Sequence, residues 1–203
     1  STVLLAQEKR VYSMPGSYIS PAEGVSWEIK QVKGINEARN CISELVHGNE
    51  IKSVVRSAHP ILEKLQIDTL EDTADINITL MAGGDELDEG SILEKRHVNR
   101  KIATVADIGI TGVDYAIAET GSCVIYGQKG VSRLVSLLPP IHLAVVEKSQ
   151  VLPTLDELFT LFRAKFLNGE VSSYMNIISG PSRSGDIENT IITGVHGPRQ
   201  THM

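Results

Sequence analysis

Cysteine is scarce in this chain: Cys41 and Cys123 are the only two among 203 residues. Two thiolates cannot supply the four ligands of an iron–sulfur cluster or a cysteine-rich zinc site, and their separation matches no metal or redox motif. Cys41 lies on the apolar face of a predicted helix and Cys123 lies within an apolar run, so we expect buried free thiols rather than a disulfide. Free thiols are typical of a reducing compartment, and we therefore expect a cytoplasmic protein.

Long apolar runs and basic clusters are also scarce. The longest apolar stretches, such as residues 143–146, fall far short of the roughly 20 residues that cross a bilayer, so we expect no membrane span. The apolar start at residues 3–6 is too short for a secretory signal. The net charge of -6 argues against nucleic-acid binding. The one basic segment, residues 94–101, is expected to form the solvated face of a helix.

Familiar catalytic motifs are missing as well. The chain has no Gly-x-Gly-x-x-Gly, no P-loop lysine motif and no His-Glu-x-x-His. Residues 180–184 match the hydrolase nucleophile elbow at the first three positions, but Ser184 stands where that motif requires glycine. The residues alone therefore predict neither a dehydrogenase nor a serine hydrolase, and we expect no metal site.

Hydrophobic periodicity predicts alternating helices and strands. A helix is expected from Asn36 to Gly48, and β-branched Val54 and Val55 indicate a strand after it. Further strands are expected at residues 102–110, 123–126 and 141–146. This alternation indicates βαβ units, and hence an α/β fold with a mostly parallel sheet.

Two further helices are expected from capping signals. Thr111 and Asp114 have the Thr-x-x-acid spacing of a helix start, and Thr154 with Glu157 has the spacing of a capping box. The second helix carries an apolar stripe that we expect to pack in the core: Leu155, Leu158, Phe159, Phe162 and Phe166. Before residue 35, proline and glycine interrupt any long element, so we expect a partly irregular extension over residues 1–34 and one domain over residues 35–203.

Three turns in the C-terminal half have a common construction, in which a short apolar run leads into glycine, hydroxyl and charged residues. The first, second and third turns are residues 118–122, 179–186 and 194–198. In open parallel sheets, ligands bind beyond the carboxyl ends of the strands, where glycine allows close approach and free N–H groups favour anions. We therefore predict a site for a small anionic ligand at these turns, although glycine and proline also serve simply to make tight turns. The predicted binding residues are Thr120, Gly121, Ser122, Gly180, Ser182, Arg183, Ser184, Asp186, Gly194 and Gly197.

Glu119 and His196 are the candidate catalytic residues. Glu119 ends an apolar segment, where partial desolvation would raise a carboxyl pKa, so it could act as an acid, a base or a nucleophile. Alternatively, its carboxylate accepts backbone N–H bonds and holds the turn. His196 could carry a proton or bind a ligand, or it could be a structural hydrogen-bonding residue. Arg183 could bind a carboxylate or phosphate, or pair with Asp186.

Four segments taken together resemble the LUD (lactate utilisation) domain family. They are GITGVDYAIAETGS at 109–122, SLLPPIH at 136–142, SGPSRSGDIE at 179–188 and GVHGP at 194–198. Their order and spacing also match, and the strongest similarity spans residues 105–198. Family members usually continue from the last motif into an apolar strand, whereas here Gln200, Thr201, His202 and Met203 follow.

The resemblance implies an α/β/α sandwich similar to the NagB/RpiA/CoA-transferase fold. It also implies an accessory role, without an iron–sulfur cluster in this chain, in bacterial oxidation of L-lactate to pyruvate. The clusters are then expected on partner lactate-utilisation proteins, and no cofactor is evident in this chain. The alternative is a small-molecule enzyme of CoA-transferase type, acting on a CoA, phosphosugar or folate-like ligand, which rests on fold analogy and on Glu119.

Overall fold

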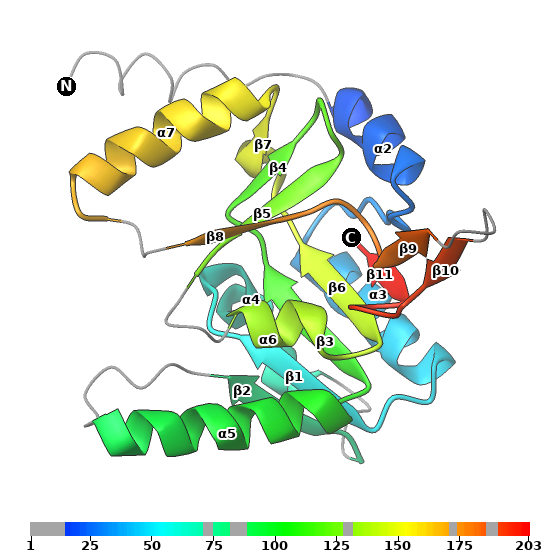
Figure 1. The fold of residues 1–203 in the computed structure, drawn as a ribbon. Helices are drawn as coiled ribbons and strands as arrows, with labels where there is room; N and C mark the ends of the chain where they lie inside the picture. Colours follow the sequence, from blue (N-terminus) through cyan, green and yellow to red (C-terminus); the bar gives the residue numbers. More distant parts are fainter. Residues whose placement is uncertain (1–14, 71–74, 82–88, 128–131, 171–173, 186–190) are drawn as a thin grey trace.

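The main sheet has five parallel strands (Figure 1). The computed structural model describes residues 15–70, 75–81, 89–127, 132–170, 174–185 and 191–203. In spatial order the strands are β11 (Gln200–His202), β6 (Ile141–Val145), β3 (Ile108–Gly112), β1 (Ser53–Ser57) and β2 (Asn77–Met81). Because β2 pairs with one side of β1 and β3 with the other, the order of the chain reverses between β1 and β3.

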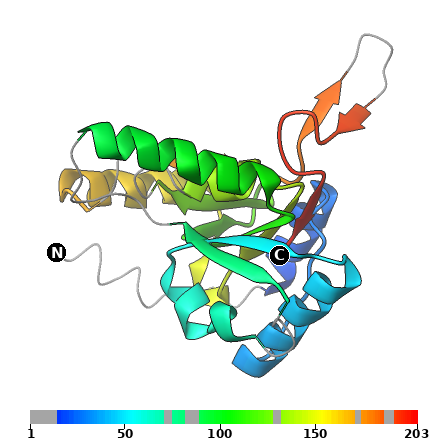
Figure 2. The same ribbon diagram turned by 90° about the horizontal axis from the view of Figure 1, so that it is seen from below.

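Helices cover both faces of this sheet (Figure 2). Helices α3 (Ile35–Gly48) and α4 (Pro60–Lys64) lie on one face, and α5 (Glu89–Val105) and α6 (Ser132–Leu137) lie on the other. Strand side chains alternate between the two cores: Val54 packs with α3 and α4, whereas its neighbour Val55 packs with α5 and α6. The fold is a three-layer α/β/α sandwich with a mostly parallel sheet, as predicted.

The chain forms a second sheet after it leaves the carboxyl ends of β3 and β6, since β4 follows β3 and β7 follows β6. Its strand order is β7 (Val151–Leu152), β4 (Tyr115–Ile117), β5 (Ser122–Tyr126) and β8 (Met175–Ile178). Helix α7 (Leu155–Leu167) covers one face through Leu158, which packs on Ile117 and Val124. Helix α2 (Pro15–Gly24) and the following Trp27 cover the other face, with Ala22 and Cys123 in that core.

Several predicted elements are confirmed. Helix α3 and strands β1, β5 and β6 lie where hydrophobic periodicity places them. The basic segment 94–101 lies on α5 and is largely exposed, as expected. Both cysteines are free, although only Cys123 is fully buried. No helix among the described residues is long and apolar enough to cross a membrane.

The helix predicted at Thr111 is wrong. Thr111 lies in β3, and the chain continues after a short break into β4, where Ala116 pairs with Cys123 of β5 and with Val151 of β7. Pairing on both edges of β4 overrides the local capping signature, because a central strand satisfies its backbone groups through both neighbours. The strand predicted at 102–110 is right only after residue 107, since α5 extends to Val105.

The apolar stripe of α7 is buried only in part. Thr154 caps the helix as predicted, with its hydroxyl accepting from Glu157 N at 3.3 Å. Leu158 is fully buried, but Phe159 is 50% exposed and Phe166 is 61% exposed. The core prediction therefore fails at Phe159 and Phe166.

Part of the predicted N-terminal extension packs into the fold. Trp27 is 2% exposed, and Glu28 and Lys30 lie beside β11, where Glu28 N donates to Thr201 O at 2.9 Å and Lys30 N donates to Met203 O at 2.8 Å. Strand β11, which follows the last motif, is therefore flanked on both sides. The boundary at residue 34 remains a prediction, but residues 22–30 contribute core contacts and edge hydrogen bonds.

Replacing Trp27 tests the contribution of this segment. Trp27→Ala should lower the free energy of unfolding by about 3–5 kcal/mol, because a large buried ring is replaced by a cavity. Urea unfolding followed by circular dichroism measures this change. Val195→Ala is the control: Val195 is 53% exposed, so its loss should change stability by less than about 0.5 kcal/mol. Equal, small effects of the two substitutions would show that the segment is not part of the core.

Candidate functional site

Glu119, in the first turn, contacts the start of helix α7. Its carboxylate accepts from Leu155 N at 3.1 Å, and its own N–H donates to Pro153 O at 2.9 Å. The side chain is exposed. These contacts are those of a carboxylate that holds a turn and satisfies a helix N-terminus. Catalysis by Glu119 remains a prediction.

A chain of hydroxyls links the first turn to the second. Thr120 Oγ1 donates to Ser122 Oγ at 2.8 Å, and the hydroxyls of Ser122 and Ser179 are hydrogen-bonded at 2.6 Å. Gly121 and Gly180 both have positive φ, and a Cβ on either would overlap the backbone of residues 21–25. These glycines therefore let the segment after α2 pack closely against both turns.

The second and third turns are hydrogen-bonded to each other through Ser182. Ser182 N donates to Pro198 O at 3.0 Å, Gly194 N donates to Ser182 O at 2.9 Å, and His196 N donates to Ser182 Oγ at 3.1 Å. A short hairpin of β9 (Arg183–Gly185) and β10 (Ile191–Thr193) projects from this point (Figure 2). Asp186 lies outside the described residues.

The second and third turns lie at the amino ends of the main strands. Arg199 N donates to Pro140 O at 2.8 Å, and these two residues directly precede β11 and β6. Arg183 donates to Ser26 Oγ, so its partner differs from those of Glu119 and His196. Hydrogen bonds therefore join the three turns to one another. Glu119, Arg183 and His196, however, each bond to a different residue. Ligand binding by the turns remains a prediction.

The carboxyl ends of β1 and β3, where the chain order reverses, hold two titratable residues. This is the position at which α/β sheets usually bind ligands. His59 follows β1 and caps α4, with Nδ1 accepting from Ile61 N at 3.3 Å. A Cβ on Gly112, the last residue of β3, would overlap the His59 ring, so the imidazole lies directly on this glycine. Asp114 follows two residues later.

Asp114 is held by the second sheet. Its carboxylate accepts from Tyr126 N at 2.7 Å. Burial raises the pKa of Asp114, although the Tyr126 N–H bond and the charges of His59 and Lys165 oppose the increase. Burial lowers the pKa of His59, and the Asp114 carboxylate partly offsets this decrease. The two pKa values are therefore displaced toward each other.

Glu147 follows β6, the neighbouring strand, and completes a polar cluster at this edge. It pairs with Lys64 of α4 at 3.0 Å, and its charge acts on His59. We call His59, Asp114 and Glu147 the carboxyl-edge cluster. The arrangement can take up and release a proton beside a bound ligand.

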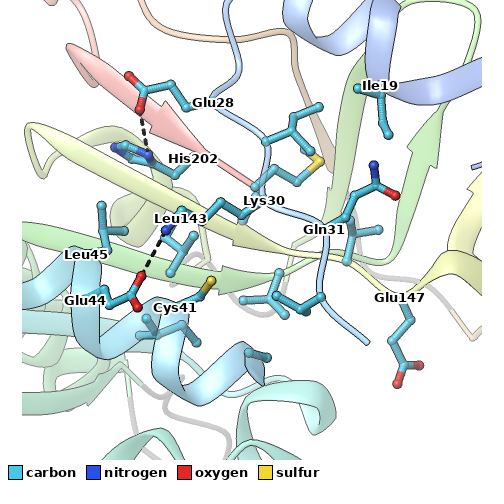
Figure 3. A pocket seen from close by; sticks show the side chains of 18 of the residues that line it. Ile19, Glu28, Lys30, Gln31, Cys41, Glu44, Leu45, Leu143, Glu147 and His202 are labelled. Carbon is cyan, nitrogen blue, oxygen red and sulfur yellow. Dashed lines mark hydrogen bonds and ion pairs between the residues drawn. The ribbon is translucent and has the colours of Figure 1, made fainter. Parts of the chain in front are cut away.

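An open cavity of about 790 Å³ begins at Glu147 and extends along the same face of the sheet (Figure 3). Helix α3 forms one wall, β6 and β11 form the floor, and residues 28–32 form the other wall. Cys41 lies on the α3 wall, and His202 lies at the β11 side. The carboxyl-edge cluster and the cavity therefore meet at Glu147.

His59 is not among the residues predicted from the sequence, and Asp114 is predicted there to lie in a helix start. A signal was present for His59, because His59-Pro60 directly follows a predicted strand, and a residue at that point is at the carboxyl edge of a parallel sheet. The cavity could not be found in the same way, because its walls come from segments that are far apart in the sequence.

One buried histidine, His142, and two partly buried histidines, His59 and His202, predict a pH-dependent stability. Burial lowers the pKa of His142 to about 3, and it also lowers the pKa values of His59 and His202. Below pH 6.5 these three histidines therefore bind more protons in the unfolded chain than in the folded chain, so their contribution to stability should decrease as pH falls. The raised pKa of Asp114 has the opposite sign and offsets part of this loss.

The His142→Gln variant isolates the largest of these effects. Glutamine can keep a hydrogen bond to Thr111, whose Oγ1 lies 2.8 Å from His142 Nε2, but it does not titrate. Between pH 6.5 and 4.5 the free energy of unfolding should decrease less steeply in the variant than in the wild type, as measured by urea unfolding. Parallel curves for the two proteins would contradict the prediction.

Comparisons with known proteins find sequence similarity over about half of the chain. The chain is 41% identical over 106 residues to Lactate utilization protein C of Bacillus subtilis (strain 168), which is 52% of this chain and 44% of that protein. It is 44% identical over 97 residues to Lactate utilization protein C of Halalkalibacterium halodurans, which is 47% of this chain and 42% of that protein. Each match thus spans less than half of the relative's length.

A solved structure and a family model extend the match to most of the chain. The crystal structure of a DUF162 family protein from Deinococcus radiodurans has a TM-score of 0.57 and 20% identity, and the match covers 92% of each chain. At that identity the likeness establishes the fold alone. The LUD domain model matches residues 18–203. The chain therefore belongs to the LUD domain family.

Proposed function

We propose that this chain acts in L-lactate utilisation as an accessory protein that carries no iron–sulfur cluster. The observation that carries the proposal is the 41–44% identity to two proteins named Lactate utilization protein C. The cysteine content supports the accessory role, because Cys41 and Cys123 are too few to ligate a cluster. Cluster chemistry in the oxidation of L-lactate to pyruvate would then belong to partner proteins.

Within this role, we assign ligand contact to the carboxyl-edge cluster rather than to the three turns. His59 and Asp114 follow adjacent parallel strands at the reversal of chain order, and their pKa values are displaced toward each other by burial. A small hydroxy or keto acid bound there would lie beside groups that can donate or accept a proton. In the turns, by contrast, the hydroxyls of Ser122, Ser179 and Ser182 are used in hydrogen bonds that join one turn to another.

Growth on L-lactate tests the role of His59. A strain lacking the gene should fail to grow on L-lactate as sole carbon source, and the wild-type gene should restore growth. His59→Asn should restore growth poorly, because asparagine keeps the cap on α4 but removes the titrating imidazole. His97→Asn, at an exposed position of α5, is the matched control and should restore growth fully. Normal growth of the deletion strain, with no redundant route present, would overturn the accessory role.

A second candidate is a small-molecule enzyme of CoA-transferase type that acts on a CoA, phosphosugar or folate-like ligand. It is favoured by the cavity beside Glu147, which has the roughly 300–1,000 Å³ volume typical of ligand sites. A thermal-shift panel of coenzyme A, sugar phosphates and folates tests it. A shift that is lost in His59→Asn but kept in His97→Asn would support the enzyme, and no shift with any of these compounds would exclude it.

A further inference from the structure

Lys165 of α7 lies over two aromatic side chains at one end of the second sheet. Its Nζ is 5.2 Å from the centroid of the Tyr115 ring and 5.3 Å from that of the Tyr126 ring. The centroids of the two rings are 5.9 Å apart and their planes meet at 75°, so the rings form a corner. An ammonium group is attracted to the face of an aromatic ring, and two rings restrict its position more than one does. Lys165 is therefore a cation with a defined location.

This cation lies at the same end of the second sheet as Asp114 of the carboxyl-edge cluster. Tyr115 directly follows Asp114, and the Asp114 carboxylate accepts from the backbone N–H of Tyr126 at 2.7 Å. Burial raises the pKa of Asp114, and the charges of His59 and Lys165 both oppose this increase, in addition to the Tyr126 N–H bond. His59 and Lys165 therefore both lie near Asp114, one following β1 of the main sheet and the other on α7.

The positive charge of Lys165 is not used in an ion pair. Within the part of the chain that the structure describes, Lys165 has no carboxylate partner. Lys64, by contrast, is paired with Glu147 at 3.0 Å. Lys148, which follows Glu147, is exposed on the turn after β6. Among these three lysines, Lys165 is thus the one that two rings hold in place and that no acidic residue neutralises by direct contact.

A ligand can reach the side chains around Asp114. Lys165, Tyr115, His59 and Asp114 are all partly exposed. A carboxylate bound beside Asp114 and Glu147 would be repelled by their negative charges unless a cation lay close to it. Lys165 supplies this cation, and an ammonium group donates strong charge-assisted hydrogen bonds to a carboxylate.

We propose that Lys165 binds the carboxylate of a small organic acid and places the rest of that acid beside His59 and Asp114. This assignment rests on the proposed function, which puts a small hydroxy or keto acid at the carboxyl-edge cluster. It adds a specificity-determining residue that lies outside the cluster and outside the three turns. Because the tyrosine rings hold the ammonium group before the ligand arrives, little side-chain freedom is lost on binding. The site should therefore discriminate between an acid and its uncharged amide.

Binding of L-lactate and of its neutral amide, lactamide, tests this assignment. Each compound is titrated into the isotopically labelled protein, and the backbone amide resonances of Gly112 and Tyr126, beside the cluster, report binding by NMR. L-lactate should shift these resonances, and lactamide should bind at least tenfold more weakly because it lacks the negative charge. This comparison needs only the wild-type protein, and equal binding of the two compounds would overturn the role of Lys165.

Two variants that each remove one positive charge from α7 separate a local contact from a general effect of charge. Lys165→Met keeps an unbranched side chain over the rings but removes the ammonium group, so L-lactate and lactamide should bind it with similar affinity. Arg163→Met removes an exposed charge two positions away, on roughly the opposite side of the helix, and should keep the wild-type preference for L-lactate. A preference that persists in Lys165→Met, or that is lost equally in both variants, would overturn the proposal. A purely structural role of Lys165 would weaken the binding of both compounds alike and leave the preference unchanged.

Failure of this proposal can be distinguished from failure of the proposed function. Growth on L-lactate tests the accessory role, whereas the NMR titrations test which residues contact the ligand. If L-lactate binds but Lys165→Met keeps the preference, only the assignment of Lys165 is overturned. If neither L-lactate nor pyruvate shifts the resonances of Gly112 and Tyr126, the carboxylate contact is overturned as well, while the growth tests still decide the accessory role.

Discussion

The parallel pairing of β1 with both β2 and β3 is the constraint on which the rest of the structure depends. Each strand satisfies the backbone groups of β1 on one side, so β1 is fixed at the point where the chain order reverses. The residues after β1 and β3 must then emerge side by side at one edge. His59 and Asp114 occupy these positions, and Gly112 allows the imidazole to lie against the backbone of β3. The carboxyl-edge cluster is thus a consequence of strand order.

The packing of Trp27 couples the N-terminal segment to both sheets. Its ring lies 5.9 Å from the ring of His142 in the main sheet, and its core neighbours include Ala116 and Cys123 of the second sheet. Placing Trp27 there brings residues 28–30 beside β11 and residues 21–25 against Gly121 and Gly180. The cavity wall and the close packing of the first two turns therefore both depend on this one buried side chain.

Local sequence patterns correctly predicted those helices and strands whose burial and strand pairing agree with the helix or strand propensity of their own residues. Helix α3 has one continuous apolar face and is confirmed, and so is the capped start of α7. The pattern failed at Thr111, where pairing of β4 with β5 and β7 outweighs a helix-start signature. It failed at Phe159 and Phe166 because periodicity shows that a helix has an apolar face but not how much of that face a partner covers.

The site was harder to predict than the fold, for a related reason. Glycine-rich turns are visible in the sequence, but whether a turn lies at the amino or carboxyl edge depends on which strand it precedes or follows. The third turn precedes β11 and therefore lies at the amino edge, although its composition resembles that of a ligand loop. His59 is at the opposite edge because it follows β1. Its proximity to Asp114 and Glu147 depends on β1, β3 and β6 being adjacent. That adjacency arises from pairings between residues 54 positions apart for β1 with β3 and 33 positions apart for β3 with β6. Strand order therefore determines which polar residues meet, and composition alone cannot supply it.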